Sequence, residues 1–134
     1  MLAMISRLSQ ADLLSTENDF SIDRLVIQLN QKYMEPWTIS SMSDYCKLSE
    51  GYFSHKFKKQ MGISPMSYLN ELRIEKSKEL LEEGTMNIST ISSVVGFQDS
   101  LYFSKVFKKS TGMSPSKFKK YLLESRTPDW YSVT

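Results

Sequence analysis

The feature that most constrains this chain is an internal repeat. The segment YFSHKFKKQMGISP at residues 52–65 returns 50 positions later as YFSKVFKKSTGMSP at residues 102–115, with nine of fourteen positions identical. Upstream, a looser match continues at an offset of 49, so the second copy holds one extra residue near Gly96 to Asp99. A repeat of this kind predicts two structural units of the same design.

Each copy is predicted to form three helices. In the first copy, apolar residues spaced three to four apart predict a short helix that begins at Thr38 or Ile39 and breaks near Lys47-Leu48. Ser49 is expected to cap the next helix, and Gly62 is expected to end it in the left-handed conformation. A Ser-Pro pair then starts a third helix.

The second copy carries the same signals at equivalent places. They are Ser89 or a nearby residue, Gly96, Asp99, Gly112 and the pair Ser114-Pro115. A helix, a tight turn and a second helix are the layout of a helix-turn-helix unit. Ser43 and Ser92 stand where the first helix of such a unit approaches the second, so we expect both to be buried. Either serine taken alone could equally face solvent.

The segment between the copies predicts one long helix. Residues 64–84, SPMSYLNELRIEKSKELLEEG, consist of strong helix formers without Gly or Pro after the initial pair and before the last residue. About twenty residues at 1.5 Å each reach roughly 30 Å, close to the ~34 Å of one DNA turn. Before the copies, a further helix is expected to begin at Ser21 and to bury Ile22, Leu25, Val26, Leu29 and Tyr33. The sequence therefore predicts an all-α fold of about seven helices, with two helix-turn-helix subdomains joined by a long linker helix.

The second helix of each copy has two chemically different faces. On a helical wheel, the core face carries Phe53 and Phe57 in the first copy and Phe103, Val106 and Phe107 in the second. The opposite face carries Gly51, Ser54, His55 and Lys58 in the first copy and Leu101, Ser104, Lys105 and Lys108 in the second. Small, polar and basic side chains suit a helix that enters a major groove about 12 Å wide. On a single amphipathic helix the same pattern would indicate only a solvated face.

Positive charge is concentrated in the two copies. The net charge of the chain is +2, but residues 38–63 carry +2 and residues 88–123 carry +5, whereas residues 1–37 and 64–87 carry −2 each. A protein that neutralises phosphates needs local positive charge. We therefore assign phosphate contacts to lysines that end or follow the second helix of each copy: Lys58, Lys59, Lys108, Lys109 and Lys117.

These motifs resemble the DNA-binding domain of the AraC/XylS family. The resemblance covers about residues 21–123, and its most specific part is the run VGF…YFSKVFKK…G.SP, which ends at Pro115. It implies a bacterial, cytoplasmic transcription factor, mostly an activator, with double-stranded DNA and RNA polymerase as partners. Matching motif positions imply that bases are contacted by Gly51, Ser54 and His55 from the first unit and by Ser100, Leu101, Ser104 and Lys105 from the second.

The resemblance also suggests the domain limits. The first helix-turn-helix would span about 38–62, the linker helix about 64–83 and the second helix-turn-helix about 88–112, followed by a tail at 124–134. Residues 1–20 would be a linker or the end of a missing upstream sensor or dimerisation domain, because family members usually carry one. A small full-length protein is the alternative.

The chain departs from the family pattern at several positions. Serine replaces the usual alanine at Ser43, Ser77 and Ser92, a change of similar size. Gly51 has no side chain at a base-facing position, and Lys105 replaces a frequent arginine. Sequence preference is therefore expected to depend on His55, on Lys105 or on DNA shape.

Other classes of function have less support in the sequence. One His and one Cys offer no catalytic triad or metal site, so neither an enzyme nor a cofactor is expected. The main alternative is a helical protein-interaction module that docks a partner helix through exposed Leu101 and Met side chains. An RNA-binding protein would need aromatic stacking platforms, but here the aromatic residues fall on helix core faces. No apolar run approaches the roughly 20 residues that span a bilayer.

Overall fold

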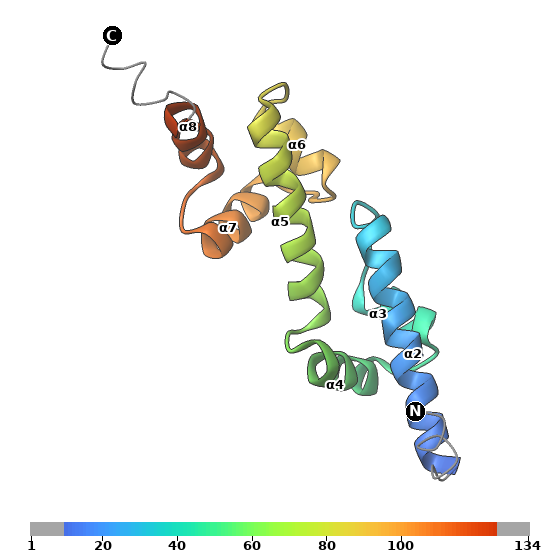
Figure 1. The fold of residues 1–134 in the computed structure, drawn as a ribbon. Coiled ribbons are helices and arrows are strands. Elements are labelled where there is room, and N and C mark those ends of the chain that lie inside the picture. Colours follow the sequence, from blue (N-terminus) through green and yellow to red (C-terminus); the bar gives the residue numbers. More distant parts are fainter. Residues whose placement is uncertain (1–9, 126–134) are drawn as a thin grey trace. The chain divides into compact units, whose positions relative to one another are not determined.

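The computed structural model describes residues 10–125, with side chains from residue 20 onward, and this range contains helices and no strand (Figure 1). In chain order the helices are α2 (Gln10–Gln31), α3 (Ile39–Cys46), α4 (Glu50–Met61), α5 (Pro65–Glu83), α6 (Ile88–Val94), α7 (Ser100–Thr111) and α8 (Pro115–Ser125). The predicted all-α class is confirmed. The linker expected at residues 1–20 and the tail at 124–134 lie partly outside the described residues.

The helices belong to two compact units. Among the described residues, the first contains residues 10–32 and 37–68, and the second contains residues 33–36 and 69–125. The boundary falls inside α5, whose first four residues belong to the first unit. Residues 33–36 therefore belong to the second unit, although the rest of that unit begins more than thirty residues later, at Leu69.

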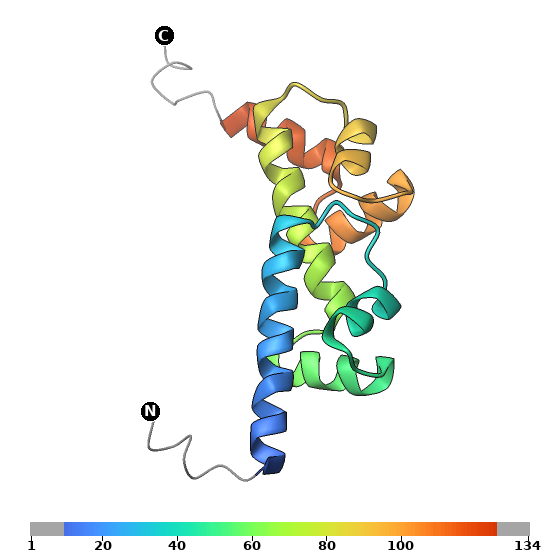
Figure 2. The ribbon, with the colours of Figure 1, turned by 90° about the vertical axis from the view of Figure 1, so that its right-hand side faces the viewer.

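The first helix is longer than the sequence predicted. α2 is continuous from Gln10 to Gln31, so Ser21, which was expected to cap the helix, lies inside it (Figure 2). The prediction was wrong because residues 10–20 contain no Gly or Pro to stop a helix, and a serine within a run of helix formers does not by itself begin one.

One face of α2 supplies the core of the first unit. Ile22, Leu25 and Leu29 have no exposed surface, as predicted, whereas Val26 is only half-buried. Tyr33 was expected on the same stripe but lies beyond the end of the helix, in the second unit. Bends and turns follow the helix at residues 32–35, so Tyr33 does not continue the stripe.

Two aromatic side chains of α4 complete this core. α3 packs against both α2 and α4. Phe53 and Phe57 are fully buried, with ring centroids 5.8 Å apart, and Phe57 meets the ring of Tyr68 edge-on at 5.8 Å. Burial of each phenylalanine contributes about 1.5–3 kcal/mol, so this pair fixes α4 with its Phe face inward.

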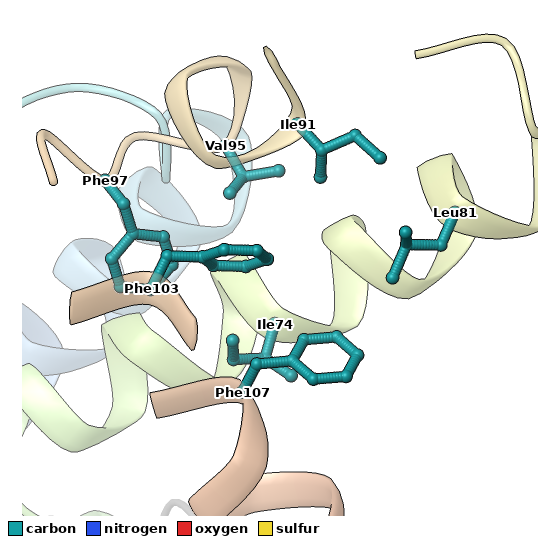
Figure 3. Packing of buried hydrophobic residues seen from close by; sticks show 7 residues of the cluster. All are labelled: Ile74, Leu81, Ile91, Val95, Phe97, Phe103 and Phe107. Carbon is teal, nitrogen blue, oxygen red and sulfur yellow. The ribbon is translucent and has the colours of Figure 1, made fainter. Parts of the chain in front are cut away.

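The second unit has a core of the same design. Figure 3 shows Phe103 and Phe107 of α7 among side chains contributed by α5, α6 and the turn that follows α6. The buried members are Ile74, Leu81, Ile91, Val95, Phe97, Phe103 and Phe107. Phe107 meets Phe118 of α8 edge-on at 5.3 Å, which repeats the contact between Phe57 and Tyr68 at an offset of 50. The repeat in the sequence is thus a repeat of core contacts.

Apart from the start of α2, the predicted helix ends agree closely with the structure. Ser64 and Ser114 each accept a backbone N–H bond from the third residue of the next helix, which begins at the proline in both copies. The cap expected at Ser89 or a nearby residue is Asn87, whose side chain accepts from Thr90 N at 2.8 Å, and Ser89 itself lies inside the first turn of α6. Asparagine caps a helix as well as serine does, so the earlier residue begins the helix.

Candidate nucleic-acid interface

The turn between the two helices is built in the same way in each unit. In the first unit, the amides of Lys47 and Leu48 donate to carbonyls three and five residues earlier, both at 3.0 Å. In the second, the amides of Gly96 and Phe97 donate at the same spacings, at 3.1 and 3.0 Å. Lys47 and Gly96 both have positive φ, 58° and 110°. The extra residue of the second copy follows this shared turn, at Gln98.

Small side chains allow the paired helices to approach. Ser43 and Ser92 are each 2% exposed, so the prediction that both are buried is confirmed. The Ser43 hydroxyl donates to the carbonyl of Ser40 at 3.0 Å, which satisfies it inside its own helix. A larger residue at either position would push the first helix away from the second.

The second helix of each helix-turn-helix, α4 or α7, has the same length and the same kinds of capping residue. Each has 12 residues. The side chains of Ser49 and Asp99 accept backbone N–H bonds from the first turn, and both caps were predicted. Each helix stops at a left-handed glycine, Gly62 or Gly112, with φ of 86° in both cases.

Burial follows an identical pattern in the two copies. All fifteen positions from Gly51 to Pro65 fall in the same class, buried, half-buried or exposed, as the residues 50 positions later. Since nine of the fourteen positions from residue 52 are identical, the agreement extends to positions where the side chains differ. Two surfaces of the same design therefore carry different chemistry at the variable positions.

On α4, the residues predicted to meet bases lie away from the core. Gly51 and His55 are exposed, while Ser54 is half-buried at the edge of the core face. Gly51 has no steric need to be glycine, because a Cβ built there meets nothing within 4 Å.

The corresponding surface of α7 carries larger side chains than that of α4, because Leu101 stands at the position of Gly51. Ser100, Leu101 and Lys105 are exposed, and Ser104 is half-buried like its equivalent Ser54. Leu101 is 73% exposed, the largest value among the exposed apolar side chains of the described residues. Leu101 and Lys105 lie on the side of α7 away from the buried Phe103, Ser104 lies on the flank between them and the core face, and Ser100 is the first residue of the helix.

The predicted phosphate-binding lysines are all exposed. Lys58 and Lys59 lie in the last turn of α4, Lys108 and Lys109 in the last turn of α7, and Lys117 in the first turn of α8. Cations near a helix C-terminus also stabilise the helix through its dipole, so the first four lysines have a structural role too. Two ion pairs lie on α5, between Lys76 and Glu79 and between Lys78 and Glu75.

The sequence did not predict the role of Arg73 of α5, which packs against the turn that precedes α7. It is only 6% exposed, and its guanidinium donates to the carbonyls of Tyr33 and Glu35, both at 2.8 Å. The guanidinium carbon also lies 5.6 Å from the ring centroid of Phe97. Burial lowers the pKa of the Arg73 guanidinium, and the neighbouring Tyr102 opposes that shift.

Arg73 fixes the turn that precedes α7. A Cβ on Gly96 would lie 2.8 Å from Arg73 Nε and 3.0 Å from both Cα and O of Met34. The guanidinium, the segment 33–36 and the turn therefore occupy one tightly packed site. In the sequence the only signal is that Arg73 is the single arginine of the long connecting helix, where lysines and glutamates are otherwise the charged residues.

No group of three or more His, Cys, Asp or Glu side chains suited to a metal ion occurs among the described residues. None of the helices described is both long and apolar enough to cross a membrane.

Comparison with known proteins relates this geometry to a family. The sequence model of a family described as "Helix-turn-helix domain" matches residues 42–121. The arabinose operon regulatory protein of Escherichia coli (strain K12) is 47% identical over 81 residues, which cover 60% of this chain and 28% of that protein. The HTH-type transcriptional activator RhaR of the same strain is 32% identical over 119 residues, which cover 89% of this chain and 42% of that protein.

A solved structure has the same fold. The C-terminal domain of AraT, a response regulator from Geobacillus stearothermophilus, matches with a TM-score of 0.71 and 28% identity, covering 86% of this chain and 88% of that domain. The chain spans less than half the length of the two curated relatives, at 28% and 42%.

Proposed function

The chain belongs to the AraC/XylS family of helix-turn-helix regulators, and on this premise we propose that it binds double-stranded DNA at specific sequences and regulates transcription. The observation that carries the proposal is the identical burial pattern of the two copies, which leaves the same face of α4 and α7 uncovered. Such a face is what a recognition helix presents to base edges in the major groove.

The two helices enter successive major-groove segments in this proposal. The length of α5 supports it, because 19 residues at 1.5 Å each give about 28 Å, comparable to one DNA turn of ~34 Å. One chain would then bind two boxes, as a dimer of single helix-turn-helix units does.

Base contacts are assigned to Gly51, Ser54 and His55 of α4 and to Ser100, Leu101, Ser104 and Lys105 of α7. The exposed lysines Lys58, Lys59, Lys108, Lys109 and Lys117 bind phosphates, because a flexible ammonium group suits a phosphate better than a base edge. His55 and Lys105 carry most of the hydrogen-bonding readout. In the cell, we propose that the protein activates transcription with RNA polymerase as a partner. We do not expect it to be an enzyme.

Selection of bound fragments from random duplex DNA, followed by footprinting at two salt concentrations, tests the proposal. We expect a bipartite motif with boxes about 10–10.5 base pairs apart and an affinity that falls steeply with salt. A single box would contradict the two-helix arrangement. Failure to enrich any sequence at low salt would contradict DNA recognition and favour a protein-interaction module.

Matched lysine variants separate phosphate contacts from base contacts. Lys108→Ala should weaken binding to all sequences alike and reduce the salt dependence, whereas Lys105→Ala should change the preferred sequence. Lys78→Ala is the control, since Lys78 pairs with Glu75 on α5 and is not assigned to DNA. An unchanged preference in Lys105→Ala would show that the readout assigned to α7 is wrong.

A further inference from the structure

The two recognition surfaces differ most in one apolar side chain. Leu101 of α7 is 73% exposed, and Gly51 stands at the equivalent position of α4. Folding of the two units requires neither the leucine at position 101 nor the glycine at position 51. Leu101 contributes nothing to the buried core, and Gly51 has room for a side chain because a Cβ there meets nothing within 4 Å.

The surroundings of Leu101 restrict what it can contact. Leu101, Lys105 and Lys108 are spaced four and three residues apart, so they lie in one stripe along α7, and all three are exposed. A partner attracted by the two ammonium groups is an anion. A partner that also covers the leucine must present an apolar group next to its negative charges.

The major groove of DNA offers one apolar group of this kind, the C5-methyl group of thymine. It lies on the base edge, between the two phosphate backbones that the lysines attract. Leu101 is the second residue of α7, and the N-terminal residues of a recognition helix are those that contact base edges.

We propose that Leu101 reads a thymine methyl group in the box bound by α7, and that Gly51 leaves the equivalent position of the α4 box without this readout. The inference rests on the proposed function and adds that the two DNA boxes are read by different chemistry. The two boxes are predicted to differ in their requirement for thymine at this position, although the helices that read them have the same length and ends.

Replacement of thymine by deoxyuridine tests the inference, because it removes the methyl group and keeps every hydrogen-bonding group of the base. In the selected operator, each thymine of both boxes is replaced singly and the Kd for the full chain is measured. At one position of the α7 box we expect binding to weaken about three- to fivefold, the value for one buried methyl group. The same replacement should have no effect on Leu101→Ala at that position.

A reciprocal variant completes the test. Gly51→Leu, which the open space around Gly51 allows, should create a preference for thymine over deoxyuridine in the α4 box. Thermal unfolding of both variants serves as the folding control, and Leu101→Ala should unfold like the parent chain because its side chain is exposed.

The outcomes also distinguish this inference from the proposed function. Specific binding that is insensitive to deoxyuridine at every position would overturn the role of Leu101 and leave the proposed function intact. A loss of affinity in Leu101→Ala that is equal for thymine and deoxyuridine would overturn it as well. If no operator can be selected at all, the proposed function fails first.

Discussion

Substitution of Gly96 by alanine should destabilise the second unit far more than the same change at another left-handed glycine. Two costs add at Gly96. Its φ of 110° is a conformation that L-residues avoid, at about 1–2 kcal/mol. The new Cβ would also lie 2.8 Å from Arg73 Nε and 3.0 Å from the backbone of Met34, and forcing an atom into a packed site costs about 1–3 kcal/mol.

The neighbours cannot move aside cheaply. Arg73 is held by two hydrogen bonds of 2.8 Å to the carbonyls of Tyr33 and Glu35, and Met34 lies between those two residues. We therefore expect Gly96→Ala to lower the free energy of unfolding by about 3 kcal/mol in total.

Gly112→Ala is the matched control. Gly112 also has a positive φ, of 86°, but a Cβ there meets nothing within 4 Å, so only the conformational cost of about 1–2 kcal/mol applies. Urea denaturation followed by circular dichroism gives both values, and a difference of about 2 kcal/mol corresponds to a midpoint shift of roughly 1 M. Equal destabilisation by the two substitutions would refute the packing argument.

Three further predictions concern single buried or capping groups. Arg73→Met should cost about 3 kcal/mol of unfolding free energy, since two part-buried carbonyls lose their donor; a loss below about 1 kcal/mol in urea denaturation would contradict this. Asp99→Ala should cost about 1 kcal/mol by removing the N-cap of α7, and Asp99→Asn should restore most of it in the same assay. Burial raises the pKa of the Cys46 thiol from 9.0 to about 11, opposed by the nearby Arg24, so the native state keeps a proton that the unfolded chain loses. The resulting stability is present below pH 9 and is lost as the pH rises to about 11; unfolding measured across this range should show a flatter decline in Cys46→Ala.

The repeat made much of the fold predictable. Ser49, Asp99, Gly62 and Gly112 act through local backbone geometry, and their roles follow from residue type and spacing alone. The same holds for the core faces of α4 and α7, where phenylalanines recur every four residues. The exposed positions of the predicted base-facing residues follow from those core faces.

Features that depend on distant contacts were not predictable. Lys47 adopts a left-handed conformation without being glycine, because its position is exposed, whereas the equivalent Gly96 is crowded by Arg73 and Met34. In the sequence, Arg73 is one more charged residue on a helix of alternating charges. Its burial depends on the segment 33–36, about forty residues earlier.

The placement of residues 33–36 in the second unit has a consequence for dissecting the protein. The chain passes from the first unit to the second at Tyr33, returns at Trp37 and passes over again at Leu69. A cut within α5 therefore yields no complete C-terminal fragment, because such a fragment keeps the Arg73 guanidinium but loses the two carbonyls that bind it. An exchange of the second unit between two regulators would have to include residues 33–36, which precede the first helix-turn-helix, together with the chain from Leu69.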